Sequence, residues 1–172
     1  MNRNNVAATI AQEPEFANEI FNLLGLHLQL ITPPVADDKD FCLFRAAMAP
    51  GVFVPIHSHK DHEVFYVLSG QLQGLSDESW HTFGPGDVFN IPGETRHALR
   101  NAASQPADFL VLTTINLGRF LHRVARPLST VPPGPPSPED LERVLLGAKE
   151  MGYWLGNAED NAAVGLNMYP VG

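Results

Sequence analysis

Residues 51–70 read GVFVPIHSHKDHEVFYVLSG, and this stretch decides the fold. It is rich in Val, Phe and Tyr, it is bounded by glycines, and a short polar turn at 60–62 divides it, which predicts two strands joined by a turn. Side chains alternate between the two faces of a strand, so His57 and His59 lie on the same face. The turn then brings Glu63, the first residue of the second strand, beside both imidazoles.

A second stretch, GDVFNIPGETRHALRN at 86–101, supplies a fourth candidate ligand. His97 follows a turn at Pro92-Gly93. Three neutral imidazoles and one carboxylate suit a borderline divalent ion such as iron, manganese, nickel, copper or zinc, whereas calcium and magnesium prefer oxygen ligands. Six-coordinate geometry would leave two positions open, as in a catalytic site. We therefore predict a metal site made by His57, His59, Glu63 and His97.

Short apolar segments of this kind recur throughout residues 26–115. Turn signals such as Pro50-Gly51, Ser69-Gly70 and the run GPGD at 84–87 separate segments long enough for about eight or nine strands. No helical pattern of useful length lies between these segments, which argues against parallel βαβ units. The sequence therefore predicts an all-β fold, an antiparallel β-sandwich or jelly-roll barrel.

Helical patterns flank the strands on both sides. Apolar residues at helical spacing predict a short helix over 13–25, with Pro14 in its first turn and Gly25 at its end. After the strands, the sequence predicts a helix ended by Pro127, a stiff Pro-rich connector at 131–136, and a last helix from Ser137 to Gly152. The expected organisation is an N-terminal segment with a short helix (1–25), a β-barrel (26–115), and C-terminal helices and connector packed on the barrel (116–172).

Length and charge narrow the functional classes. The chain of 172 residues fits one domain, and its formal net charge of -8 disfavours nucleic acid and anionic membranes as partners. The N-terminal residues contain no continuous apolar stretch for export or for spanning a membrane, so a cytoplasmic location is expected. The single cysteine, Cys42, lies in an apolar run and is expected to be a buried, inert thiol.

The two histidine stretches together resemble the two conserved motifs of the cupin superfamily. The first has the form G-x5-H-x-H-x3-E-x6-G and the second G-x5-P-x4-H-x3-N, matched by residues 51–70 and 86–101. One position departs, because Glu94 stands where the family usually has glycine. We expect Gly93 to supply the positive φ that the turn needs.

The resemblance implies a three-His, one-Glu site similar to that of the quercetin-dioxygenase-like cupins. It implies one divalent transition metal, with Fe2+ first and Mn2+, Ni2+, Cu2+ or Zn2+ as alternatives, and a homodimer. By analogy, Glu63 is the catalytic residue: it loosens from the metal and takes a substrate proton if its pKa is raised. His62, in the turn between the ligand strands, is either a group near the substrate or an exposed turn residue.

Strand alternation also predicts which side chains line the pocket. Phe53 is predicted to share a face with His57. A two-residue turn at Ser69-Gly70 would pair Val67 with Leu72 and Phe65 with Gly74. The glycine beside Phe65 either leaves room for a ligand or serves the twist of the sheet. The predicted pocket residues are Phe53, Phe65, Val67, Leu72, Leu99 and Asn101. Such a pocket favours a small apolar or aromatic molecule held by one oxygen on the metal.

Three functions remain open at this stage. The first is a dioxygenase acting on a small oxygen-bearing substrate. The second is an isomerase, lyase or hydrolase in which the metal acts as a Lewis acid without dioxygen. The third is a non-catalytic small-molecule-binding cupin. For the homodimer, the N-terminal helix and the strand at 26–34 are the candidate contacts, since open sheets have edges that need covering.

Overall fold

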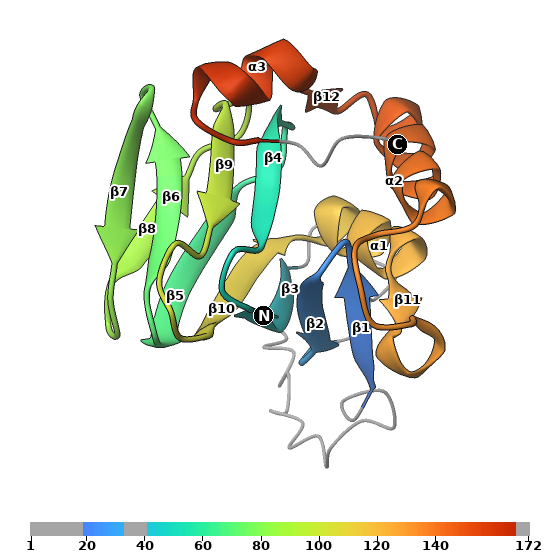
Figure 1. Cartoon of the computed structure of the whole chain (residues 1–172), viewed down its shortest axis with the longest axis horizontal. Helices are drawn as coiled ribbons and strands as arrows, with labels where there is room; N and C mark the ends of the chain where they lie inside the picture. The colour runs from blue at the N-terminus through green and yellow to red at the C-terminus, as the bar shows by residue number, and fades with distance from the viewer. Residues whose placement is uncertain (1–18, 33–40, 168–172) are drawn as a thin grey trace, which may run out of the picture.

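The computed structural model describes residues 19–32 and 41–167, and its strands form two antiparallel sheets packed face to face (Figure 1). The large sheet has seven strands in the order β11 (Arg126–Pro127), β1 (Ile20–Leu23), β2 (Leu26–Leu30), β3 (Phe41–Met48), β10 (Ala107–Thr114), β5 (Glu63–Ser69) and β8 (Val88–Ile91). The small sheet has five, in the order β12 (Trp154–Leu155), β4 (Phe53–Ser58), β9 (His97–Arg100), β6 (Leu72–Ser76) and β7 (Ser79–Phe83). The predicted antiparallel sandwich is confirmed, but the strands do not close into one continuous barrel.

The predicted turn at Ser69-Gly70 connects two different sheets. Strand β5 belongs to the large sheet and β6 to the small one, so the predicted pairing of Val67 with Leu72 was wrong. Val67 pairs with Phe109, and Phe65 pairs with Val111 and Phe89. Turn chemistry marks where a strand ends, but it does not determine which strand the next one joins.

The predicted N-terminal helix is only partly testable, since residues 1–18 lie outside the described residues. Its described end was predicted wrongly, because residues 20–23 form β1 rather than a helical turn. Leu24 and Gly25 have φ values of 53° and 97° and form a tight turn into β2, and the Gly25 N–H donates to Asn22 Oδ1 at 3.1 Å. Pairing of β1 with both β2 and β11 outweighs the helical spacing of its apolar residues.

Two of the helices after the main strands lie where the sequence predicted them. Helix α1 spans Ile115–Val124, a short 3-10 helix, η1, spans Leu128–Thr130, and α2 spans Pro138–Met151. The Ser137 hydroxyl caps α2 by accepting from the Asp140 N–H at 3.1 Å, and Gly152 ends the helix with a φ of 70°. A third helix, α3 (Ala158–Ala163), and the short strands β11 and β12 were not predicted.

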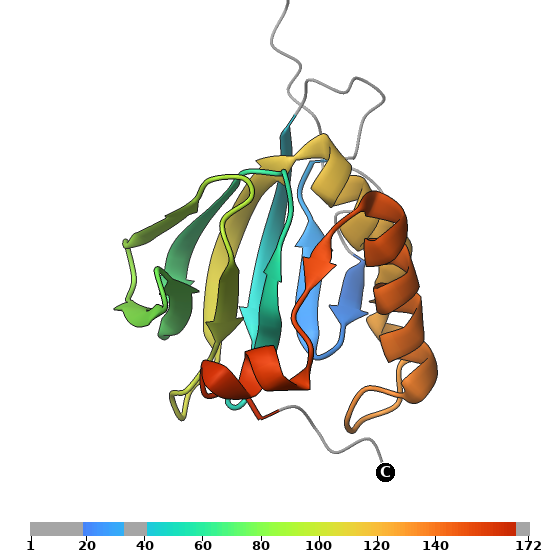
Figure 2. The ribbon, with the colours of Figure 1, turned by 90° about the horizontal axis from the view of Figure 1, so that it is seen from above.

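The helices cover two sides of the sandwich. Helices α1 and α2 pack together beside the β1 end of the large sheet, and α3 lies by the small sheet (Figure 2). Helix α1 approaches β3 closely at Gly118, where an added Cβ would lie 2.7 Å from the Cys42 sulfur. Cys42 is fully buried and burial raises the pKa of its thiol, as expected of an inert cysteine.

The main core fills the space between the sheets. Its fully buried side chains include Met48, Val67, Leu72 and Phe109. A second cluster, made around Ile56, Leu75, Ala98 and Leu166, lies on the opposite face of the small sheet. Among the residues that the structure describes, no helix is both long and apolar enough to cross a bilayer.

Candidate metal centre

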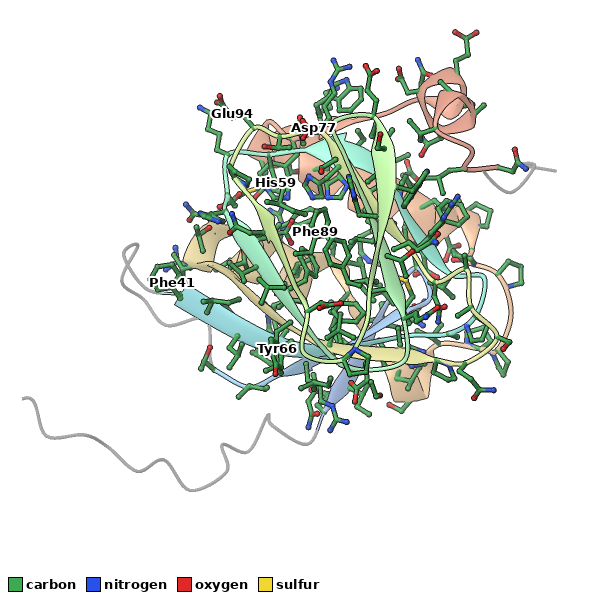
Figure 3. All side chains as sticks on the ribbon, turned by 90° about the vertical axis from the view of Figure 1, so that its left-hand side faces the viewer. Phe41, His59, Tyr66, Asp77, Phe89 and Glu94 are labelled. Atoms are coloured by element: carbon green, nitrogen blue, oxygen red, sulfur yellow. The ribbon has the colours of Figure 1, made fainter. Side chains whose placement is uncertain are left out.

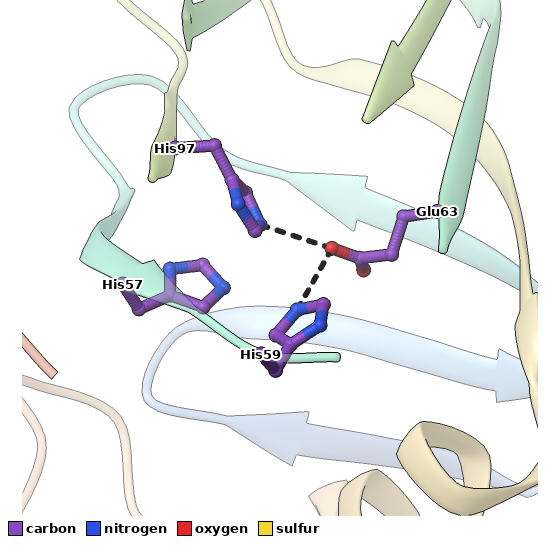
Figure 4. A group of neighbouring side chains, drawn as sticks. All are labelled: His57, His59, Glu63 and His97. Atoms are coloured by element: carbon purple, nitrogen blue, oxygen red, sulfur yellow. Dashed lines mark hydrogen bonds and ion pairs between the residues drawn. The ribbon is translucent and has the colours of Figure 1, made fainter. Parts of the chain in front are cut away.

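Four side chains from the two sheets meet between them (Figure 4). His57 lies in β4, His59 directly after it, Glu63 at the start of β5 and His97 at the start of β9. One nitrogen or oxygen atom from each residue lies within 4.8 Å of those of the other three. His59, Glu63 and His97 are 5%, 7% and 1% exposed, whereas His57 is only half-buried. His57 is therefore the least buried of the four residues.

All three imidazoles are oriented in the same way. The Nδ1 atom of each ring lies against a backbone carbonyl oxygen two residues away: His57 on Pro55 at 2.8 Å, His59 on Asp61 at 3.1 Å, and His97 on Thr95 at 2.9 Å. A carbonyl oxygen only accepts, so each Nδ1 carries the proton. In the neutral ring each Nε2 then offers its lone pair as a ligand.

The Nε2 atoms of His59 and His97 face the same oxygen of Glu63. Glu63 Oε2 lies 3.0 Å from His97 Nε2 and 3.2 Å from His59 Nε2 (Figure 4). The contact with His59 is not aligned as a hydrogen bond, which leaves His59 Nε2 buried without a hydrogen-bond partner among the described residues. An orphaned buried nitrogen is costly unless it binds an ion. Three ring nitrogens and a carboxylate oxygen therefore fit a divalent transition metal.

The pKa values of three members of the group are shifted, and not all in the same direction. Burial, reinforced by the neighbouring His97, lowers the pKa of His57 to about 3, so this ring stays neutral. Burial alone would raise the pKa of Glu63, but the facing imidazoles of His59 and His97 hold it below its usual range. The expected raised pKa is thus not found, and Glu63 is an ionised carboxylate. Burial would lower the pKa of His59, but the adjacent Glu63 raises it overall.

A β-bulge in β4 changes the predicted face of Phe53. Val54 pairs with Leu99 and His57 with His97, so Pro55 and Ile56 together oppose a single residue of β9. The extra residue shifts the alternation. Val54 packs against the main core, on the side where His97 and Leu99 lie, whereas Phe53 packs in the cluster on the other face. Phe53 was therefore placed on the wrong face by strict alternation.

In the loop before His97, Glu94 occupies the position where the cupin motif usually has glycine. Glu94 itself adopts a φ of 67°, while Gly93 has no positive φ, so the expectation for Gly93 was wrong. Gly93 is required for a different reason, since a Cβ there would lie 2.2 Å from the Lys60 carbonyl oxygen. The two motifs thus touch at the turn that carries Glu94.

The remaining predicted pocket residues take two roles. Phe65, Val67, Leu72 and Leu99 are almost completely buried in the main core between the sheets. Asn101 holds a turn: its amide donates to Met48 O and Gln105 O, and its side-chain oxygen accepts from Ala103 N–H.

The space expected at Gly74 is filled by another side chain. A Cβ added there would lie 2.2 Å from the Phe89 ring, so the glycine admits this core residue. In Figure 3, His59 and Phe89 both lie between the sheets. His62 is exposed and its Nε2 lies 2.6 Å from Asn90 Oδ1, which fits a turn residue.

Two residues close to the centre were missed by sequence reasoning. Asp61 is only 7% exposed and lies in the turn between the ligand strands, and Tyr153 donates its hydroxyl to Asp61 Oδ2 at 2.7 Å. Tyr153 follows α2 and is far from the motifs in sequence, so no local pattern indicated it. Asp61 stood inside the motif and could have been singled out as the one acid in the turn 60–62.

Comparison with known proteins agrees with the fold and the motifs. Residues 44–113 match the family model described as "Cupin domain". A comparison with curated proteins gave no match. The Cupin_2 domain of an XRE family transcriptional regulator from Enterobacter cloacae is 29% identical, with a TM-score of 0.46, over 52% of this chain and 96% of that chain.

Two further solved structures are similar in fold. The polyketide cyclase RemF from Streptomyces resistomycificus is 18% identical with a TM-score of 0.54, over 62% of this chain and 80% of that chain. A Cupin 2 conserved barrel domain protein from Salinispora arenicola is 24% identical with a TM-score of 0.51, over 68% of this chain and 99% of that chain. Residues 44–113 therefore match a cupin domain, and the two-sheet fold is similar to that of the Salinispora arenicola barrel protein.

Proposed function

We propose that this chain is a metal-dependent enzyme that binds one divalent transition-metal ion through His57, His59, Glu63 and His97. The observation that carries the proposal is the shared orientation of the three imidazoles. Each Nδ1 is fixed on a backbone carbonyl, which leaves three Nε2 atoms and a carboxylate oxygen around one point. Fe2+ is the first candidate ion, and Mn2+, Ni2+, Cu2+ and Zn2+ fit the same donors.

The reaction that we propose is the oxygenation of a small apolar or aromatic substrate that carries an oxygen atom. When bound, a redox-active ion would polarise the substrate oxygen and activate dioxygen. The three histidines hold their rings in fixed orientations, and the half-buried His57 marks the side from which substrate enters. The apolar core below the centre, which includes Phe65 and Leu99, excludes water.

Glu63 is the proposed proton acceptor of this reaction. Its carboxylate is ionised, because the facing imidazoles hold its pKa below the usual range, and it can therefore receive a proton on Oε2. A strongly lowered pKa makes Glu63 a weak base while it faces His59 and His97. Proton transfer accordingly requires the carboxylate to leave one of these imidazoles.

The experiment is metal analysis of the untagged protein followed by oxygen-electrode assays with phenols and diketones. We expect about one transition-metal ion per chain, and dioxygen uptake that His97→Ala abolishes. Turnover without dioxygen uptake would favour the Lewis-acid alternative, for which the fold leaves room, since RemF, which has a similar fold, is a polyketide cyclase. Protein without bound metal, and unable to take it up, would contradict the proposal.

We further propose that the chain forms a homodimer through the outer face of the large sheet. The expected edge position of the strand at 26–34 was wrong for its described residues, since β2 pairs with both β1 and β3. Instead, exposed apolar side chains lie on neighbouring strands of the outer face: Tyr66, Val88 and Leu112 are 42%, 52% and 39% exposed. Apolar side chains gathered on an open sheet face are typical of an association surface.

A further inference from the structure

The C-terminal segment 152–166 lies outside the residues that match the cupin family model, yet it runs beside the metal ligands. It leaves α2, forms β12 on the edge of β4, and continues into α3 beside the small sheet (Figures 1 and 2). Within β12, Leu155 pairs with His57 and Trp154 pairs with Ser58. His57, one of the proposed metal ligands, is therefore paired directly with a residue of this segment.

Tyr153 connects the segment to His59 through Asp61. Its hydroxyl donates to Asp61 Oδ2 at 2.7 Å, and its ring centroid lies 5.2 Å from that of His59. The other Asp61 oxygen accepts from the Thr114 hydroxyl, and the Asp61 backbone oxygen holds His59 Nδ1 at 3.1 Å. Asp61 is thereby held from two sides, and it orients a ligand ring in turn.

The bulge that presents His57 is held by the same segment. Ile56, in the bulge, donates its N–H to Asn161 Oδ1 at 3.0 Å and accepts from Gly156 N–H at 2.8 Å. Asn161 is completely buried, and its amide donates to Gly156 O at 3.0 Å and Asn157 O at 2.8 Å. Both backbone groups of Ile56, one residue before His57, are therefore satisfied from the C-terminal segment.

A third contact lies near the remaining histidine ligand. The guanidinium of Arg96 lies 4.2 Å from the centroid of the Trp154 ring, and Arg96 directly precedes His97. Contacts of the segment thus lie close to His57, His59 and His97, although they come from a part of the chain without a metal motif.

We propose that the segment 153–161 is a positioning element of the metal centre: Tyr153 fixes His59 through Asp61, and Asn161 fixes the bulge that presents His57. The inference rests on the metal site proposed above. Groups behind metal-ligating histidines set the ring orientation, and their removal typically costs roughly ten- to a hundred-fold in metal affinity. The competing explanation is that the segment only covers apolar surface on the small sheet.

The test compares Co2+ binding by the full chain and by four single variants. Tyr153→Phe deletes one hydroxyl and keeps the ring, and its matched control is Tyr66→Phe, on the outer face of the large sheet. Asn161→Ala removes the contact with the bulge, and its control is Asn116→Ala, an exposed position of α1 outside this segment. Affinity is measured by titration, ligand geometry by the visible spectrum of bound Co2+, and stability by thermal unfolding.

We expect Tyr153→Phe and Asn161→Ala each to bind Co2+ about ten-fold more weakly, with a changed spectrum, at temperatures where both variants are folded. Their controls should keep the affinity and spectrum of the unaltered chain. If both variants retain that affinity and spectrum, even with lowered melting temperatures, the segment is only a cover and the inference is wrong. Failure of the unaltered chain to bind Co2+ would instead contradict the proposed metal site itself.

Discussion

The backbone N–H of Glu94 donates to the carbonyl oxygen of His59 at 2.5 Å, while Glu94 holds a φ of 67°. This hydrogen bond joins the loop before His97 to the segment that carries His59. The left-handed conformation costs a residue with a side chain roughly 1 kcal/mol, a cost that glycine does not have. The hydrogen bond between the two motifs therefore forms although Glu94 must adopt a backbone conformation that disfavours residues with a side chain.

Replacing Glu94 by glycine should therefore leave the centre intact and slightly stabilise the fold. We expect the free energy of unfolding to rise by up to about 1 kcal/mol in urea denaturation, with metal affinity unchanged. The contrasting variant is Gly93→Ala, whose Cβ would meet the Lys60 carbonyl oxygen at 2.2 Å. It should lose about 2 kcal/mol of stability. Equal stability of the two variants would contradict this account of the loop.

Removal of single ligands should abolish metal binding without unfolding the chain. His57→Ala and His97→Ala should each lose most of the bound metal, because each removes one of four donors, while far-UV circular dichroism stays that of the unaltered chain. His62→Ala serves as the control, because His62 is exposed and contacts Asn90 rather than the centre. Full occupancy in either ligand variant would show that the ligand assignment is wrong.

The start of α2 should make the fold sensitive to acid. Burial alone would raise the pKa of Asp140, but Arg143, Ser137 and Arg126 lower it to about 2. A folded-state pKa below the unfolded value means that the stabilisation is present above about pH 4 and is lost as the pH falls toward 2. Its size is on the order of 2 kcal/mol.

Asp140→Asn tests this pH dependence directly. The variant should be less stable than the unaltered chain at pH 7, and the difference should shrink as the pH is lowered below about 4. Urea denaturation at several pH values measures it. A difference that stays constant down to pH 2.5 would rule out ionised Asp140 as the cause.

If the outer face of the large sheet forms the dimer, a charged side chain introduced on that face should lower the molecular mass measured in solution. Val88→Lys or Leu112→Lys, on the outer face of the large sheet, should convert a dimer into a monomer in light scattering, because a lysine there would be buried without a partner. Leu145→Lys is the control, since Leu145 is 56% exposed on α2, away from this face. A monomeric unaltered chain, or a dimer that survives both substitutions, would contradict the proposed face.

The two motifs predicted that His57, His59, Glu63 and His97 cluster, because all four residues lie near two turns. Alternation along β4 and the turn at 60–62 are local, and they correctly predicted that His57, His59 and Glu63 come together. The face of Phe53 could not be predicted the same way, because a bulge at Pro55-Ile56 shifts the alternation. Within that bulge, both backbone groups of Ile56 are hydrogen-bonded to a segment distant in sequence.

Local sequence patterns could not predict which sheet each strand joins, nor which residues the C-terminal segment contacts. Ser69-Gly70 was correctly recognised as a turn, but whether β6 pairs with β5 depends on competition among all strands. Tyr153 and Asn161 belong to no motif, and their contacts with Asp61 and Ile56 form only because the chain after α2 runs back along β4. The helix predicted over 13–25 failed in its described part because apolar spacing in a short segment fits a strand edge as well as a helix.

The position of β12 also determines where another polypeptide could extend the small sheet. An exposed edge strand is a template for strand addition and for aggregation. At the edge nearest the metal ligands, that template is already occupied by the chain's own C-terminal segment. The opposite ends of the sheets, β7 and β8, lie together on the far side (Figure 1). A foreign strand could therefore not pair with β4 beside His57, and strand addition would be directed to β7 or β8 instead.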